Sequence, residues 1–430
     1  LGQVAAAKVR SFLPQDLAAI AHAFARLQLQ DDELLAAVAD QALAKVGDFE
    51  PRGLSNLAWA FATFRMYDEK LQGAIAVEAA EKVQRFKLQE LANFAWAATA
   101  LHFGERGLLR EISEAALAAI RTSGPQGLSS PALAEFATTV LGVVWAAGFS
   151  GALGGGALLT SARAALLAAG RRLDATPAAA AGPSALAVAV RGRAPAGTPD
   201  VVLELVDRVV VGKPPDWEAD DGPAALGREP RRLSTFLQPV LGARRWPLAR
   251  DAAHRCGLLH RLDVPSSGLL LVARTYEAYY DLQLQLNAGE LQRDYFAACH
   301  GWLPEEPRTV RAPVLWSSWE KRPSRVSARG RPAVTRLRSW ALGWRGADSL
   351  SLLTLRIGTG RRHQIRVHLA HIGHPVAGDA GYLSAAVAEV DAEWCHRHFL
   401  HRHRLAFRDL ARRRCEALAP PPEDLLAALA

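Results

Sequence analysis

The stretch 260-HRLDVPSSGLLLVAR-274 decides the fold of the C-terminal half of this chain. Its second part, Gly268 to Ala273, is a continuous apolar run after a Pro-Ser-Ser turn, and such runs are typical of a strand buried on both faces. Just before the turn, Arg261 and Asp263 place a guanidinium and a carboxylate close together. An isolated Arg-x-Asp pair is most often a surface ion pair, so the rest of the chain must decide whether this pair does chemistry.

Length and composition indicate a folded protein with more than one domain. At 430 residues the chain exceeds the usual size of one hydrophobic core, so two or three domains are expected. Hydrophobic residues make up 50% and charged residues 22%, which excludes a disordered chain. The four cysteines are scattered without a C-x-x-C pair, which favours reduced thiols over a disulfide framework.

The net charge of +8 belongs to the C-terminal half. Residues 201–430 hold 33 Lys and Arg against 25 Asp and Glu, a difference of +8, whereas residues 1–200 hold 18 of each. Residues 311–370 alone hold 13 basic and 2 acidic side chains. A polyanion such as RNA is the natural partner of this basic region, and the alternative is a solvated surface in an arginine-biased sequence.

The N-terminal part contains an internal repeat with a period of 37 residues, between residues 14 and 123. Apolar positions recur at this spacing: Leu17, Leu54 and Leu91; Leu34, Leu71 and Leu108; Val38, Ile75 and Ile112; Ala42, Ala79 and Ala116. Each unit shows helical periodicity in two successive segments, with Asp31 and Asp68 as caps of the second helix. Because such a hairpin cannot bury both of its faces alone, the sequence predicts a stacked α-solenoid over residues 1–170.

A fourth, degenerate unit is expected to start near Leu133. Residues 136–162 carry no charge and are long enough to cross a bilayer, but their six glycines favour a helical hairpin, so no membrane contact is expected. The phrase LANFAWAAT at residues 91–99 resembles the helical repeats of organellar RNA-binding factors of the octotricopeptide or heptatricopeptide type. The resemblance implies RNA binding. Because this half has no net charge, a protein partner on the solenoid is the alternative.

The residue composition and the hydrophobic pattern change in the second half of the chain. Residues 171–199 are rich in Ala, Pro and Gly and are interpreted as a linker. From there β-branched runs predict strands over residues 201–205 and 208–211, followed by a Pro-broken loop.

Several motifs of residues 200–428 together resemble the RluA-like family of pseudouridine synthases. The opening stretch resembles the family's H-R-L-D-x-x-[ST]-S-G-L motif, and residues 355–379 resemble its T-G-R-x-H-Q-I-R-x-H-L motif. Weaker matches lie at the Lys213-Pro214 loop and at residues 293–301, 330–335 and 397–407. Two departures are Asp216 at a glycine position and Arg362 where the family usually has threonine. The resemblance implies an α+β catalytic domain over residues 200–430, with a mixed, mainly antiparallel sheet and no cofactor.

The resemblance also assigns site residues. Asp263 matches the catalytic carboxylate, Arg366 its cationic partner, and Tyr295 the aromatic platform for the uracil. A carboxylate that must stay ionised in a partly closed pocket needs such a cation. Arg261 matches the arginine that fills the space of the flipped nucleotide. The predicted RNA-binding residues are Arg261, His260, Arg293, Arg361, Arg362, His363 and Gln364.

The histidines near both ends of this domain invite a metal interpretation. One set, His363, His368, His371 and His374, belongs to the RNA-enzyme motif. A second set, Cys395, His396, His398, His401 and His403, falls at or beside residues 397–407, which match a strand of the family pattern. No metal is therefore predicted, and a zinc site is the alternative.

The sequence thus predicts an RNA pseudouridine synthase acting on structured RNA (rRNA, tRNA or mRNA), fused to a helical solenoid. The alternative is an organellar RNA-processing factor with a catalytically silent synthase domain. A mitochondrial or chloroplast location is expected, with the cytoplasm as the alternative. The chain begins at Leu1, so the sequence does not decide whether a targeting segment precedes it.

Overall fold

The fold was analysed in a computed structural model of the 430-residue chain. The structure describes residues 5, 8–104, 106–153, 156–175, 197–219, 231–242, 245–306, 308–316, 323–346 and 348–429. These residues form two compact units: residues 1–169 with 286–289, and residues 170–285 with 290–430. Each unit is described separately.

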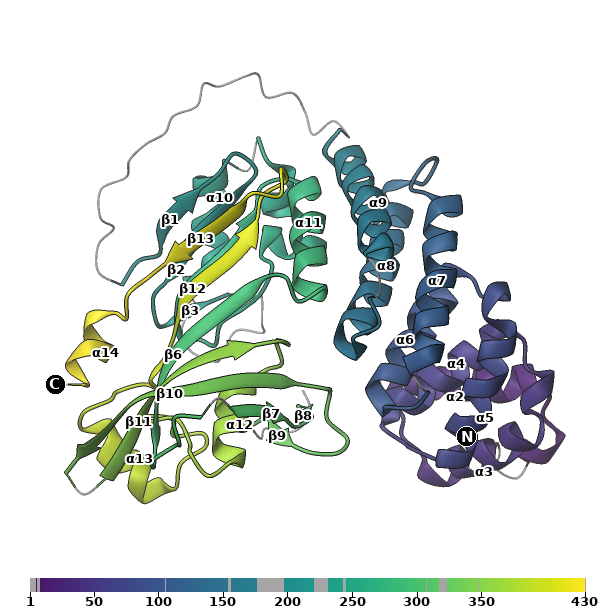
Figure 1. The fold of residues 1–430 in the computed structure, drawn as a ribbon, viewed down its shortest axis with the longest axis horizontal. Helices are drawn as coiled ribbons and strands as arrows, with labels where there is room; N and C mark the ends of the chain where they lie inside the picture. The colour runs from purple at the N-terminus through teal and green to yellow at the C-terminus, as the bar shows by residue number, and fades with distance from the viewer. Residues whose placement is uncertain are drawn as a thin grey trace. The chain divides into compact units, whose positions relative to one another are not determined.

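The N-terminal unit is built from helices, coloured purple to teal in Figure 1. They are α2 (Pro14–Leu27), α3 (Asp32–Ala44), α4 (Pro51–Phe64), α5 (Glu69–Lys82), α6 (Leu88–Leu101), α7 (Arg106–Ser123), α8 (Ser130–Ser150) and α9 (Ala157–Asp174). The first helices of the repeats start at residues 14, 51 and 88, and the second helices at 32, 69 and 106, so both series step by 37. The predicted repeat of helical hairpins is confirmed.

The repeat also fixes capping and stacking. Asp31 and Asp68 each accept a hydrogen bond from a backbone N–H in the first turn of α3 and α5, at 3.0 Å, as predicted. The rings of His22, Trp59 and Trp96, again 37 residues apart, form a row with centroid distances of 5.1 and 6.4 Å. Equivalent residues of successive repeats therefore contact one another, which is the packing expected of a solenoid.

Helix α8 is the one described helix whose length and composition would suffice to cross a membrane. It begins at Ser130, close to the predicted start of the fourth unit, and it packs against α6 and α7 with Leu133, Val140 and Val144 buried. The predicted helical hairpin of this region corresponds to α8 and α9. Helix α9 continues to Asp174, so the first four residues of the predicted linker are helical, and residues 176–196 lie outside the described part.

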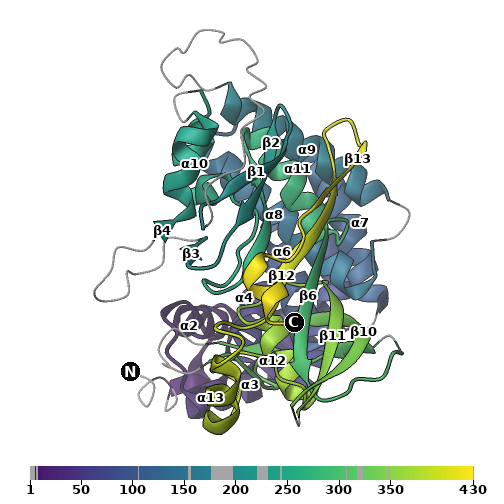
Figure 2. The same cartoon turned by 90° about the vertical axis from the view of Figure 1, so that its left-hand side faces the viewer.

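The C-terminal unit contains a nine-stranded sheet in the order β1-β2-β5-β12-β6-β11-β10-β7, with β13 paired to β12 (Figure 2). Its strands are β1 (Asp200–Glu204), β2 (Arg208–Lys213), β5 (Ser267–Ala273), β6 (Gln292–His300), β7 (Arg308–Arg311), β10 (Val334–Arg345), β11 (Asp348–Ile357), β12 (Leu400–Arg408) and β13 (Arg414–Leu418). Among the described strand pairs of this nine-stranded sheet only β5–β12 is parallel, so the predicted mixed, mainly antiparallel sheet is confirmed.

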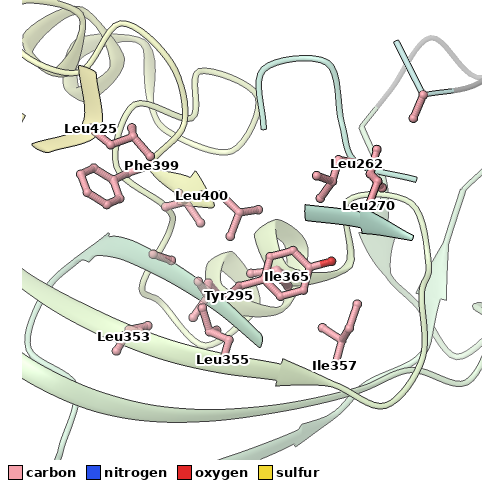
Figure 3. Close-up of a cluster of buried hydrophobic side chains, with 14 of the residues drawn as sticks. Leu262, Leu270, Tyr295, Leu353, Leu355, Ile357, Ile365, Phe399, Leu400 and Leu425 are labelled. Atoms are coloured by element: carbon pink, nitrogen blue, oxygen red, sulfur yellow. The ribbon is translucent and has the colours of Figure 1, made fainter. Parts of the chain in front are cut away.

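Short elements complete this unit. Two-stranded pairs form from β3 (Trp217–Glu218) with β4 (Arg231–Arg232) and from β8 (Val314–Leu315) with β9 (Arg325–Val326). The helices are α10 (Leu233–Leu241), α11 (Tyr276–Asn287), α12 (Gln364–His371), α13 (Ala385–Ala392) and α14 (Glu423–Ala427). One face of the sheet packs on a core in which Leu270, Tyr295, Leu355 and Ile365 converge (Figure 3). This α+β architecture is the predicted one.

Candidate active site

Asp263 lies in a loop that enters the fully buried strand β5. Three basic side chains from other segments hold this loop by its backbone oxygens. Lys213 Nζ donates to Val264 O at 3.0 Å, Arg397 Nη1 to Pro265 O at 2.9 Å, and Arg402 Nη2 to Arg261 O at 3.2 Å. Since the loop oxygens on both sides of Asp263 are bound, the carboxylate is presented from a rigid backbone.

The serines and the glycine of the opening stretch explain why strand β12 lies beside this loop. Ser266 Oγ hydrogen-bonds His398 Nε2 at 2.8 Å, and Ser267 Oγ hydrogen-bonds His401 Nδ1 at 2.9 Å. Gly268 has φ +121°, and a Cβ there would overlap the backbone of Arg402 in the paired strand. Only glycine allows β5 and β12 to approach so closely at this point.

Arg366 is the cation that the structure brings to Asp263. Its Nη1 donates to Asp263 Oδ2 at 3.1 Å, as predicted. The other edge of its guanidinium donates from Nε and Nη2 to Asp379, with both distances 2.6 Å. Its Cζ also lies 5.1 Å from the ring centre of Tyr382. Arg366 is thus oriented by Asp379 and Tyr382 while one N–H remains directed at Asp263.

This arrangement keeps Asp263 ionised. Burial alone raises the pKa of the carboxyl, but the positive charges of His363, Arg366 and His398 outweigh burial and leave the pKa below its ordinary value of 3.8. Burial lowers the pKa of His363 and of His398 to about 4. Both imidazoles are therefore neutral near pH 7, and Arg366 is the cation that stabilises the carboxylate there.

Tyr295 lies on β6 and is buried, with 4% of its surface exposed. Its hydroxyl hydrogen-bonds Arg402 Nη2, and the Arg402 guanidinium lies 4.8 Å from the ring centre. Arg402 Nη1 also contacts His260 Nδ1 at 2.6 Å and donates to Leu269 O at 3.0 Å. Tyr295 is therefore linked to the Asp263 loop through Arg402, whereas Asp263 and Arg366 contact each other directly.

The predicted RNA-binding residues fall into two groups. Arg261 and Arg362 are exposed, and Arg361 and His363 are half-buried, so these four are accessible to a ligand. His260, Arg293 and Gln364 are buried, with 6%, 4% and 3% exposed. The side chains of this second group are buried in the protein, and their direct contact with RNA stays a prediction.

Gln364 has a clear structural role inside the protein. Its amide donates to Val334 O and Thr335 Oγ1, both at 3.0 Å, and its oxygen accepts from Thr359 Oγ1 at 2.7 Å and from Arg361 N at 3.0 Å. All its hydrogen-bonding capacity is used inside the protein. It fixes the loop before α12, and through that loop it fixes the position of Arg366.

The two departures from the family pattern have simple structural outcomes. Asp216 adopts a left-handed conformation, φ 66°, which aspartate tolerates better than most residues, and its N–H donates to Val264 O at 2.9 Å. The Lys-Pro loop therefore keeps a glycine-like turn. Arg362 lies over the indole of Trp316, with 4.7 Å from Cζ to the ring centre, so it packs against an exposed aromatic side chain.

The histidine clusters do not converge. His368, for example, is buried and bonded to Thr335 Oγ1 at 2.9 Å and to Ala312 O at 2.8 Å. Within the described ranges no group of three or more His, Cys, Asp or Glu side chains is placed to hold a metal ion.

Comparison with known proteins agrees with this geometry. Residues 243–371 match the family model described as RNA pseudouridylate synthase, which spans both strong motifs up to His371. The predicted resemblance of the C-terminal half is thereby confirmed. Residues 2–124 match the model of RNA-editing substrate-binding complex 6 protein, and this match covers the first three helical hairpins.

Individual relatives carry names of the same class. Ribosomal large subunit pseudouridine synthase D of Nitrosomonas europaea is 41% identical over 128 residues, covering 30% of this chain and 36% of the relative. The enzyme of the same name from Haemophilus influenzae is 33% identical over 184 residues, covering 43% and 52%. Ribosomal large subunit pseudouridine synthase C of Yersinia pestis is 35% identical over 161 residues, covering 37% and 49%. The chain spans about a third to a half of the length of these relatives.

Two solved structures are similar. Human RNA Pseudouridylate Synthase Domain Containing 1 is 25% identical with a TM-score of 0.42, covering 55% of this chain and 90% of that one. Human RNA Pseudouridylate Synthase Domain Containing 4 is 19% identical with a TM-score of 0.39, covering 53% and 91%.

Three residues of this site were missed in the sequence. Asp379 was part of the second strong motif, but only the structure shows that it binds Arg366. His398 is hydrogen-bonded to Ser266, and its charge lowers the pKa of Asp263. Arg402 had a signal: the family pattern R-x-x-L-H-A, placed on Arg397, Leu400 and His401, has alanine where this chain has a buried arginine.

Proposed function

We propose that this protein is an RNA pseudouridine synthase that uses Asp263 as its catalytic carboxylate. The observation that carries the proposal is the part-buried pair of Asp263 and Arg366, in which the pKa of Asp263 is lowered although burial alone would raise it. A carboxylate in such a place is either an ion pair of structural value or a reactive group. The family match around both residues favours the reactive group.

Beyond Asp263 and Arg366, the reaction requires few chemical groups from the protein. Pseudouridine forms when the C1′–N1 bond of uridine breaks, the uracil turns, and C1′ bonds to C5, while the proton on C5 leaves to solvent and N1 gains one. An ionised carboxylate either attacks C1′ or removes a proton from the sugar, and both routes use Asp263 Oδ. Arg366 keeps the carboxylate charged and oriented before the reaction.

The substrate is RNA in which the target nucleotide leaves its stack, at a cost of a few kcal/mol. We propose that Arg261 occupies the space left by that nucleotide, and its exposure two residues before Asp263 supports this role. The names of the bacterial relatives make large-subunit ribosomal RNA the first substrate to test. We also propose that the solenoid contributes to target choice, since its family match is named for RNA-editing substrate binding. The proposed location is a mitochondrion or chloroplast.

Asp263→Asn tests the catalytic role, because it keeps the side-chain shape but removes the charge. Purified wild-type protein and the variant are incubated with total RNA, and new pseudouridines are mapped. We expect sites in the wild-type reaction that are absent with Asp263→Asn, while RNA affinity stays within about threefold.

Asp409→Asn serves as the control. Asp409 is also an arginine-paired carboxylate, bonded to the exposed Arg413 at 2.7 Å, and it plays no part in the proposed chemistry. It should leave the sites unchanged. Identical sites with wild type and Asp263→Asn would sink the proposal.

A further inference from the structure

Arg402 and Arg293 are two buried arginines that have no carboxylate partner among the described residues. They are 1% and 4% exposed, and their hydrogen bonds there go only to uncharged groups. Arg208, which is 0% exposed, instead binds the carboxylates of Asp207 and Asp281. Because a buried cation without a counter-charge is costly, the pair of Arg402 and Arg293 marks a place where negative charge is missing.

The side chains around this pair leave several N–H groups unused. Arg293 donates once, from Nη2 to Ile357 O at 3.4 Å, and within the described ranges neither its Nε nor the Nε of Arg402 has a partner. Burial and the charges of Arg402 and Arg293 lower the pKa of His260 well below 6.5, so His260 is neutral. It accepts from Arg402 through Nδ1, which leaves its own N–H at Nε2, also without a partner there. Burial lowers the pKa of Arg293 to about 10, so Arg293 is still charged near pH 7.

Tyr295 is a neighbour of both cations and has a hydrogen atom to donate. Arg293 precedes it by two residues on β6, so the two side chains lie on one face of the sheet, and Arg402 donates to its hydroxyl oxygen. Since arginine can only donate, the O–H of Tyr295 must point elsewhere, and no residue in the described ranges accepts it. The hydroxyl of Tyr382, by contrast, donates to Ser324 O at 2.8 Å.

The unused O–H of Tyr295 is on the side of the Asp263 loop. Arg402 Nη2 donates both to the Tyr295 hydroxyl and to Arg261 O, the latter at 3.2 Å and two residues before Asp263. Figure 3 shows the Tyr295 ring with its hydroxyl directed to the side on which Leu262 lies. A base that reacts at Asp263 is therefore the ligand that this donor suits.

Breaking the C1′–N1 bond of uridine creates negative charge on the base. Whether Asp263 attacks C1′ or takes a proton from the sugar, the electron pair of the broken bond leaves with the uracil, whose N1, O2 and O4 share the charge. The charge is consumed when C5 bonds to C1′, before C5 loses its proton and N1 gains one. Donors that are fixed in a buried site stabilise such a transient anion more than they stabilise neutral uridine, which lowers the barrier.

We propose that Tyr295 donates its hydroxyl hydrogen to a carbonyl oxygen of the departing uracil, and that Arg402 and Arg293 supply the positive charge that stabilises this anion. Tyr295 touches the base, whereas the two arginines act through Tyr295 as positioning residues. Arg402 stands where the family pattern has alanine, so this cation is a feature of this chain. The inference rests on the proposed function, because the anion forms only in that reaction.

The first test compares two RNA substrates in single-turnover reactions of the full chain. One has uridine at a site that the wild type modifies, and the other has 6-azauridine, whose ring nitrogen withdraws electrons and stabilises the anion while C5 keeps its hydrogen. With uridine, Arg402→Gln should slow the reaction about tenfold, which is less than the roughly hundredfold loss of a donor that contacts the anion directly. With 6-azauridine the loss should shrink to about threefold or less, because the base itself holds the charge better.

Arg293→Gln separates function from stability. It removes a buried charge that has no counter-charge, so the urea midpoint should stay at or above that of the wild type, while the rate with uridine falls about fivefold or more. Arg208→Gln is the matched control, because it removes a buried arginine that has carboxylate partners. It should lower the urea midpoint and leave the rate per folded molecule unchanged.

A double variant tests whether Arg402 acts through Tyr295. Tyr295→Phe/Arg402→Gln should be no slower than Tyr295→Phe alone, because the hydroxyl that Arg402 supports is already absent. Losses that multiply in the double variant would show that Arg402 acts independently of Tyr295 and would overturn the inference.

Equal losses with uridine and 6-azauridine in Arg402→Gln would also overturn it, since a residue that only supports the fold slows both reactions alike. If Arg402→Gln does not fold, Arg293→Gln gives the same comparison of substrates. A wild type that forms no pseudouridine would overturn the proposed function and this inference together. An active wild type with equal losses on both substrates would overturn this inference alone.

Discussion

Asp379 binds Arg366 through two hydrogen bonds of 2.6 Å, whereas Asp263 accepts only one from it, at 3.1 Å. The arginine is therefore held mainly by Asp379 and less by Asp263, the proposed catalytic carboxylate. Asp379 is 2% exposed and Arg366 9%, so this anchoring pair is shielded from solvent. Because Asp379 holds Arg366 away from solvent, the guanidinium keeps a fixed direction. Asp263 accepts only one of its hydrogen bonds, through Oδ2.

Asp379→Asn tests this division of roles. The change removes the charge that orients Arg366, so we expect kcat for pseudouridine formation to fall by about a hundredfold, the cost of a misplacement near 1 Å. It should also lower the free energy of unfolding by about 3–5 kcal/mol, since a buried cation loses a partner. Single-turnover kinetics and denaturant unfolding measure the two effects.

Asp294→Asn is the matched control, because Asp294 also binds two arginines, Arg356 and Arg404, but on the outer side of the sheet. It should lower stability and leave kcat nearly unchanged. A hundredfold loss of kcat in both variants would mean that the effect comes from general damage to the sheet.

We expect Arg366→Gln to change the pH dependence of the rate of pseudouridine formation. In the wild type the pKa of Asp263 is below 3.8, so the carboxylate is charged throughout the neutral range, and its stabilising effect is lost only as pH falls through that lowered pKa. Without Arg366, Asp263 loses a cation and a hydrogen bond that oppose the effect of burial, so the pKa of Asp263 rises. The acidic limb of the pH–rate profile should therefore move upward by at least about one pH unit.

The measurement is the rate at saturating RNA between about pH 3 and pH 8, taken where circular dichroism shows the variant to be folded. Arg404→Gln, which removes a cation from the outer side, should leave the limb in place. A limb at the same pH in wild type and Arg366→Gln would show that Arg366 does not set the charge of Asp263.

Gly268→Ala should disrupt the domain. The Cβ of an alanine at position 268 would overlap the backbone of Arg402, and φ +121° is strained for alanine. Neither strand can move away without a large cost in free energy. We expect a loss of about 3 kcal/mol or more in the free energy of unfolding. Gly343→Ala in β10 is the control, because nothing lies within 4 Å of its added Cβ. Equal stability of the two variants would contradict the close approach of β5 and β12.

How far the sequence predicts this molecule depends on the range of each signal. The 37-residue repeat sets helix starts directly, since each unit repeats the same local pattern, as at Leu17, Leu54 and Leu91. The pairing of Arg366 with Asp263 joins positions 103 apart and came only from the family resemblance. No periodicity in the chain encodes it.

The burial of polar residues is a feature that the sequence does not predict. A motif shows that His260, Arg293 and Gln364 are typical of RNA enzymes, but it does not show which way they point. Gln364 faces inward because the loop before α12 needs its four hydrogen bonds. Arg402 was overlooked because basic residues are rarely fully buried, so an arginine on a strand is normally placed outside.

Tyr295 offers the sharpest separation of structure from function. Its hydroxyl accepts a hydrogen bond from Arg402 Nη2, and Tyr295→Phe removes one of the two acceptors of that buried nitrogen, which should cost about 1–3 kcal/mol of stability. If Tyr295 also aligns the uracil or its hydroxyl acts near the reacting centre, pseudouridine formation per folded molecule should fall at least tenfold. Single-turnover rates normalised to the folded fraction measure this.

Tyr280→Phe provides the comparison, because Tyr280 is as buried as Tyr295, with 3% against 4% of its surface exposed. Its hydroxyl is 3.0 Å from His254 Nε2, to which it is hydrogen-bonded, and not bonded to Asp263. Both variants lose one buried hydroxyl hydrogen bond, so their unfolding free energies should fall by similar amounts. Only Tyr295→Phe should slow the reaction. If both variants react at the wild-type rate, Tyr295 is a core residue and Arg402 serves the fold alone. If Tyr295→Phe alone is slow, the chain Tyr295–Arg402–Arg261 connects the core to the Asp263 loop for a catalytic reason.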